Sequence, residues 1–102
     1  MTQLTSKQRA YLRKLAHRLK PVVYVGSEGV TDPVLGSVTD ALNTRELIKV
    51  KLQESAPVAT REAAGLIAAG LDDVHPVQTI GRTIVLYRRH PDEPEIKLPR
   101  SS

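Results

Sequence analysis

Two glycines three residues apart, Gly26 and Gly29, lie in the stretch YVGSEGVTDP, between an apolar run and a predicted helix start at Thr31. Glycine allows a ligand to come close to the backbone, and the positive end of a helix attracts anions such as phosphate. The same glycines can instead serve only to supply a positive φ in a tight turn. A nucleotide cofactor is not predicted, because no Gly-Lys-Ser/Thr follows and the third glycine of a dinucleotide fingerprint is lacking. The loop also contains an acid, Glu28, which opposes phosphate binding.

Basic residues are concentrated at the start of the chain, whose net charge is +4. Residues 1–25 contain no acid, and their six basic residues are Lys7, Arg9, Arg13, Lys14, Arg18 and Lys20. An organellar transit peptide has a similar composition, but this segment leads directly into a predicted strand and shares its apolar face with the fold, which favours a folded helix. Basic surfaces bind anionic partners, of which nucleic acid is the commonest.

Metal sites and membrane segments are not expected. The chain has no cysteine, and its histidines, His17, His75 and His90, are far apart in sequence, whereas zinc needs four ligands close together. The longest apolar run, 63–71, is about half of the roughly 20 residues that span a bilayer. We therefore expect a soluble, cytoplasmic protein without a metal or other cofactor.

Composition does not favour an enzyme either. Ser27 has no histidine near it in sequence, and Asp72 and Asp73 are typical of a solvated turn. Proteins that stack bases on a sheet use Phe, Tyr and Trp, whereas this chain has only Tyr11, Tyr24 and Tyr87. Because Tyr24 and Tyr87 fall in predicted strands, we expect both to pack in the core. Nucleic-acid binding is then predicted to rest on phosphate contacts and shape.

The periodicity of apolar residues gives the elements that must position these groups. Helices are predicted over about 6–18, from Thr31 onward and over about 57–69, and strands over 22–25, 46–52, 77–80 and 83–87. The strand VVYV at 22–25 is predicted to be buried, whereas ELIKVKL alternates and places Lys49 and Lys51 on one cationic face. The order α-β-α-β-α-β-β predicts an α/β (α+β) fold, with a mixed sheet whose first strands are parallel.

Three segments, LTSKQRAYLRKLAHRLKPVVYVGSEGVT, ELIKVKL and QTIGRTIVLYRR, resemble in order and spacing the CRM domain, named for chloroplast RNA splicing and ribosome maturation, in its stand-alone bacterial YhbY-like form. The resemblance runs from about residue 4 to 89, and IKLPR at 96–100 is similar to the tail of that family. It implies a four-stranded mixed sheet packed by helices, like the C-terminal domain of translation initiation factor three. It also implies RNA binding and, for stand-alone members, association with precursors of the large ribosomal subunit.

We therefore predict a single domain over 1–89 with an extended tail over 90–102, expected to be a monomer that binds ribosomal RNA during large-subunit assembly. The predicted RNA-binding residues are Gly26, Ser27, Gly29, Thr31, Lys7, Arg13, Lys14, Lys20, Lys49 and Lys51. Many members of the family have a basic residue in the GxxG loop, where this chain has Ser27 and Glu28. The alternatives are a module that docks on a ribosomal or other protein without RNA affinity of its own, and an RNA-processing enzyme.

Overall fold

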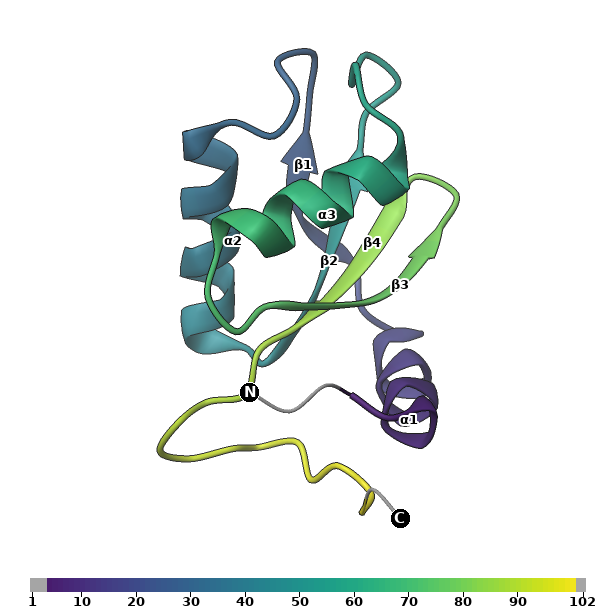
Figure 1. Cartoon of the computed structure of the whole chain (residues 1–102), viewed down its shortest axis with the longest axis vertical. Coiled ribbons are helices and arrows are strands. Elements are labelled where there is room, and N and C mark those ends of the chain that lie inside the picture. Colours follow the sequence, from purple (N-terminus) through teal and green to yellow (C-terminus); the bar gives the residue numbers. More distant parts are fainter. Residues whose placement is uncertain (1–3, 101–102) are drawn as a thin grey trace.

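The computed structural model describes residues 4–100, which form three helices and a four-stranded sheet (Figure 1). The elements in chain order are α1 (Ser6–Ala16), β1 (Pro21–Val25), α2 (Asp32–Thr44), β2 (Leu47–Leu52), α3 (Thr60–Gly70), β3 (His75–Ile80) and β4 (Thr83–Tyr87). This is the predicted element order and α+β class. None of the helices in this part of the chain is both long and apolar enough to cross a bilayer.

The strands lie in the order β1-β2-β4-β3, with β1 parallel to β2 and the other neighbouring pairs antiparallel. The predicted mixed sheet with its first strands parallel is therefore confirmed. A parallel pair needs a crossover connection, which α2 supplies between β1 and β2. A tight turn at Gly81 and Arg82 joins β3 to β4 in an antiparallel hairpin.

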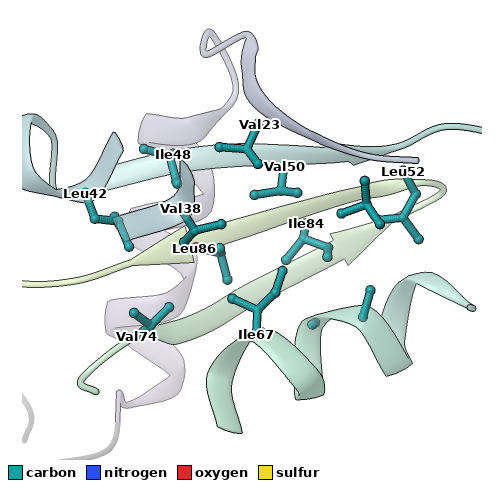
Figure 2. Packing of buried hydrophobic residues seen from close by; sticks show 13 residues of the cluster. Val23, Val38, Leu42, Ile48, Val50, Leu52, Ile67, Val74, Ile84 and Leu86 are labelled. Atoms are coloured by element: carbon teal, nitrogen blue, oxygen red, sulfur yellow. The ribbon is translucent and has the colours of Figure 1, made fainter. Parts of the chain in front are cut away.

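One face of the sheet is covered by α2 and α3, which lie against it in Figure 1. Alternate strand residues point to this face, as the period of two demands. Its core includes Val23, Ile48, Val50, Ile84 and Leu86 from the strands, Val38 and Leu42 from α2, and Ile67 from α3 (Figure 2). Each such side chain contributes roughly 1.5–3 kcal/mol on burial, so this face contains most of the apolar stabilisation.

The opposite face is covered at one end only, by α1 and the C-terminal tail. Leu12 and Ala16 of α1 pack there on a second cluster of sheet residues, Leu47, Val77, Val85 and Tyr87. Ile96 and Leu98 of the tail pack against the same cluster. Within residues 4–100, no helix lies over the other end of this face, which leaves strand side chains exposed.

Glu46 holds the tail in place. Its side chain is 3% exposed, and its two carboxylate oxygens accept hydrogen bonds from three backbone N–H groups of the tail, those of His90, Glu95 and Ile96, at 2.7–2.8 Å. Burial alone raises the pKa of this carboxyl, but the three N–H donors and the nearby His90 outweigh it and lower the pKa. The ionised carboxylate is therefore the form that stabilises the tail.

Two helices differ in length from their predictions. Thr5 caps α1 in a capping box with Gln8, but the helix ends at Ala16, two residues before its predicted end. The third helix begins at Thr60, about three residues late. The Thr60 hydroxyl donates to the Gly81 carbonyl at 2.7 Å, and Ala59 at the N-cap supplies no side-chain hydrogen bond. A contact with the hairpin turn, which no local pattern encodes, therefore holds the first residue of α3, although it pairs none of the N–H groups that a cap would pair.

The prediction that Tyr24 packs in the core is wrong. Val23 and Val25 are buried under α2, but the Tyr24 side chain is 52% exposed on the other face of β1. Tyr87, by contrast, is 2% exposed, as predicted. The difference arises because β1 is an edge strand and α1 lies over the opposite end of the face to which Tyr24 points.

Candidate nucleic-acid interface

The uncovered part of the sheet, which we call the open sheet face, has side chains from all four strands. Its residues are Val22, Tyr24, Lys49, Lys51, Gln78, Ile80 and Thr83. One row crosses the whole sheet, because Tyr24 pairs with Lys51, Lys51 with Thr83, and Thr83 with Ile80. Residues paired in register point to the same face, so these four side chains form a continuous line.

A groove of about 740 Å³ lies beside this face, between the end of α1 and β3. We call it the basic groove; its lining residues are Arg13, Lys14, Leu15, His17, Arg18, Gln78 and Ile80. A smaller cavity of about 160 Å³ continues from it onto the sheet, where Arg13 and Lys49 both line the wall. None of the described residues that line either cavity is acidic, so the surface presents cations from two elements without a neutralising partner in its lining.

Three of the six predicted basic residues line the two cavities, and a fourth, Lys51, lies next to them on β2. Arg13 and Lys14 line the basic groove, Lys49 lines the smaller cavity, and Lys51 is exposed one row further along β2. Lys7 and Lys20 are exposed but line neither cavity: Lys7 is in the first turn of α1 and Lys20 just precedes β1. Arg13, Lys14, Lys49 and Lys51 therefore form a cluster, whereas Lys7 and Lys20 lie outside it.

Two further residues near this surface have structural roles. Arg9 donates from its Nη1 to the carbonyl of Pro76 at 2.8 Å and makes a longer contact to that of Val77, which fixes α1 on β3. Burial lowers the pKa of His75, a shift that Asp73 opposes and Arg9 reinforces, so His75 is neutral at pH 7. Neither residue adds a free positive charge to the groove.

The GxxG loop lies at the far end of β1 from α1 (Figure 1). Gly29 has φ of 76°, donates its N–H to the Gly26 carbonyl at 3.0 Å and is packed near Pro57. The turn itself therefore requires Gly29, and its N–H is already used. Gly26 has no such φ, and an added Cβ there would meet only the end of the flexible Gln53 side chain, at 3.0 Å.

The start of α2 offers few free donors to an anion. Thr31 caps the helix by accepting from the Val34 N–H at 3.3 Å, and Pro33 has no N–H. Asp32, in the first turn, and exposed Glu28 bring negative charge to the same end. Within residues 4–100, the N–H groups of Ser27 and Glu28 have no backbone acceptor. The loop can thus offer these two amides, rather than the full helix terminus that the sequence suggested.

Several residues of the interface were missed at the level of sequence. Tyr24, Gln78, Ile80 and Thr83 lie on the open sheet face, and His17 and Arg18 line the basic groove. Buried and exposed positions alternate along β1, which places Tyr24 on the opposite face from Val23 and Val25. Because the run VVYV has no charged or strongly polar residue, the sequence does not show which of the two faces is buried. The groove residues come from segments some 60 residues apart, and only the fold brings them together.

The described residues contain no group of three or more His, Cys, Asp or Glu side chains able to hold a metal ion. The buried Glu46 carboxylate, which is occupied by the tail N–H groups, lies away from the basic groove. The chemistry available at this surface is therefore that of cations, amides and an exposed aromatic ring, which suits binding of a polyanion.

A protein-family model, the CRS1/YhbY (CRM) domain, matches residues 4–88. The chain is 45% identical over 103 residues to an RNA-binding protein of Haemophilus influenzae, covering 98% of this chain and 99% of that protein. It is 40% identical over 96 residues to the "Probable RNA-binding protein YqeI" of Bacillus subtilis, covering 94% and 99% of the two chains.

The fold is also similar to a solved structure. A hypothetical protein of Staphylococcus aureus, described as a candidate RNA-binding protein, has a solution structure that superposes with a TM-score of 0.80 at 36% sequence identity. The similarity covers 95% of this chain and 100% of that one. The three helices and the mixed sheet are therefore shared across nearly the whole of both chains.

Proposed function

The chain belongs to the CRS1/YhbY (CRM) domain family, and from this we propose that it is an RNA-binding protein that contacts ribosomal RNA in the precursor of the large ribosomal subunit. The observation that carries the proposal is the basic groove, with its acid-free lining, beside Lys49 and Lys51. Relatives of similar length are named as RNA-binding proteins. The ribosomal target follows from the family resemblance noted in the sequence.

In this proposal the cations bind the RNA backbone. Arg13 presents a planar guanidinium suited to two hydrogen bonds to one phosphate. The neighbouring phosphates are bound by Lys14, Lys49 and Lys51, which act as point charges. Such contacts release counterions and fix the position of the RNA without reading its sequence. We therefore expect strong salt dependence and weak sequence preference for this part of the surface.

The GxxG loop is proposed as a second, weaker contact. The N–H groups of Ser27 and Glu28 can donate to a phosphate, and Gly26 leaves room for the backbone to come close to it. Gly29 and Thr31 shape this loop, through the turn and the helix cap, rather than touching RNA. Lys7 and Lys20 are proposed to act at longer range, by adding to the positive potential.

A paired substitution tests this assignment. Arg13→Ala combined with Lys49→Ala removes two cations that line the same cavity. Each phosphate contact contributes about 0.7–0.9 to the slope of log affinity against log salt, so the double variant should bind protein-free ribosomal RNA more weakly, with a slope shallower by about 1.5. Arg61→Ala is the matched control, because Arg61 is exposed on α3, which packs on the other face of the sheet.

Equal slopes for the wild type and the double variant would contradict an RNA site at the groove. A wild-type chain that binds assembled particles but no free RNA would instead support docking on a ribosomal protein. The ribosomal target needs a separate experiment: ultraviolet crosslinking in cells, with the crosslinks mapped on RNA. Enrichment in large-subunit precursor RNA supports it, whereas crosslinks spread over messenger RNA contradict it.

A further inference from the structure

Tyr24 is exposed at one edge of the open sheet face, next to the cations proposed to bind phosphate. It starts the row that continues through Lys51 and Thr83 to Ile80, at the opposite edge of the sheet. Tyr24 and Ile80 are 52% and 59% exposed, and the Val22 side chain lies beside Tyr24 on the same strand. The row therefore has a cation at its centre and apolar side chains at both ends.

Packing within the protein does not account for this tyrosine. The Tyr24 ring belongs to neither apolar cluster, and its phenol has no hydrogen-bond partner among residues 4–100. A single exposed apolar side chain needs no explanation. An aromatic ring that lies one strand from a lysine, about 4.8 Å away across the sheet, is the arrangement with which proteins hold a base and its phosphate together.

We propose that Tyr24 stacks on an unpaired base of a single-stranded RNA segment while Lys51 binds an adjacent phosphate. This inference rests on the proposed RNA-binding function and adds the class of RNA that the open sheet face takes. Four-stranded sheets in other RNA-binding proteins stack two or three bases. The row from Tyr24 to Ile80 likewise crosses a four-stranded sheet, over a distance of roughly 14 Å at about 4.8 Å per strand-to-strand step.

The occupant is a single strand rather than a duplex. Bases in a duplex are stacked on one another, and the deep, narrow major groove of A-form RNA hides their edges from side chains. A ring on a flat sheet can reach only a base that is already unstacked. The cations of the basic groove, by contrast, can bind the phosphates of either form. Tyr24 is thus the residue that distinguishes single-stranded from double-stranded RNA.

Substitutions at Tyr24 test the proposal with two RNA probes, a single-stranded oligonucleotide and the duplex made from it with its complement. Tyr24→Leu keeps an apolar side chain but loses the π-face, and should weaken single-strand binding by about 5- to 150-fold, the equivalent of about 1–3 kcal/mol per stacked base. Duplex binding should change less than about twofold. Tyr24→Phe keeps the ring and should bind both probes like the wild type. Tyr11→Leu, on α1 outside the row, is the control.

Tyrosine fluorescence supplies a second readout, because the chain has no tryptophan and only three tyrosines. Stacking on a base should quench the Tyr24 emission, so the quench seen with wild type should be largely lost in Tyr24→Phe although that variant still binds. Single-strand affinity that Tyr24→Leu leaves unchanged, or an equal loss for both probes, overturns the stacking proposal while RNA binding stands. A wild type without affinity for either probe overturns the proposed function itself.

Discussion

At the scale of single residues, the two loop glycines have different tasks. Gly29 adopts a positive φ and closes the turn onto the Gly26 carbonyl, whereas Gly26 has only the Gln53 side chain near the place of a Cβ. The sequence pattern treats them alike. We therefore predict that Gly29 is needed for the fold, whereas Gly26 is needed for the close approach of a ligand to the loop.

Replacing each glycine by alanine separates these tasks. Gly29→Ala should lower the free energy of unfolding by about 1–2 kcal/mol, because a left-handed backbone brings Cβ too close to the following carbonyl oxygen. Gly26→Ala should change stability by less than about 0.5 kcal/mol, since Gln53 can move aside. Urea denaturation measures both. If Gly26→Ala is folded yet binds RNA more weakly, the backbone at Gly26 touches RNA; equal stability of the two variants would contradict the turn assignment.

Glu28 is the loop residue whose charge fits RNA binding least well. At about 6 Å from a phosphate its carboxylate would be repelled by roughly 0.7 kcal/mol at the dielectric constant of water and nearly 3 kcal/mol at an effective value of about 20. Glu28→Gln should therefore bind RNA a few-fold more tightly than the wild type, and Glu28→Lys more tightly still. The differences should shrink as salt rises.

Titration of the three proteins with the same RNA at two salt concentrations checks this order. Equal affinities at low salt would place the loop away from the RNA and leave the basic groove as the binding site. Asp40→Gln, at an exposed position further along α2, shows how much any lost negative charge contributes from a distance.

At the scale of elements, local pattern predicts most strands and helices but not which side of an element is covered. The alternation in β2 identified its cationic face, because lysine and aliphatic residues alternate there. In β1 the apolar run VVYV has no such contrast, so the exposed side of the strand is invisible in the sequence. The position of α1 over the opposite end of the sheet determines which side of β1 is exposed, and this position depends on tertiary packing.

Glu46 is a second case in which tertiary structure overrides the local pattern. The residue opens a predicted strand and has no neighbour in sequence that needs it, because its donors lie 44–50 residues away, at His90, Glu95 and Ile96. No spacing rule relates residues that are so far apart in sequence. The burial of this acid and its contacts with the tail could be found only in the folded chain.

Removing the Glu46 charge should destabilise the protein in a pH-dependent way. An amide offers one accepting oxygen where the carboxylate offers two, so Glu46→Gln should cost about 1–3 kcal/mol at pH 7. Because the folded pKa of Glu46 is lowered, its stabilisation is present above the ordinary pKa of about 4.5 and is lost as pH falls through the folded value. The two proteins should therefore converge in stability in acid.

Urea denaturation at pH 7 and near pH 3 measures this convergence, with Glu54→Gln, at an exposed position after β2, as the control. A difference between wild type and Glu46→Gln that is as large in acid as at neutral pH would show that packing, rather than charge, holds the tail. The absence of any difference at pH 7 would contradict the contacts with the tail altogether.

At the scale of the whole molecule, charge is divided between faces. None of the acids in residues 4–100 lies on α1 or on the open sheet face; they occur in the loop and helix beyond β1, just before and just after β2, on or near α3, and in the tail. The sequence already predicted the α+β order, the parallel start of the sheet and a basic first helix. What it could not predict is the groove, because Arg13 and Gln78 meet only after α1 folds back onto the hairpin.

The most direct test of the central claim is the affinity of the wild-type protein for protein-free ribosomal RNA across a series of salt concentrations. If the groove and the open sheet face contact roughly four to six phosphates, log affinity against log salt should fall with a slope of about −3 to −5. A slope near zero, or no binding at low salt, would contradict an RNA interface built on these cations.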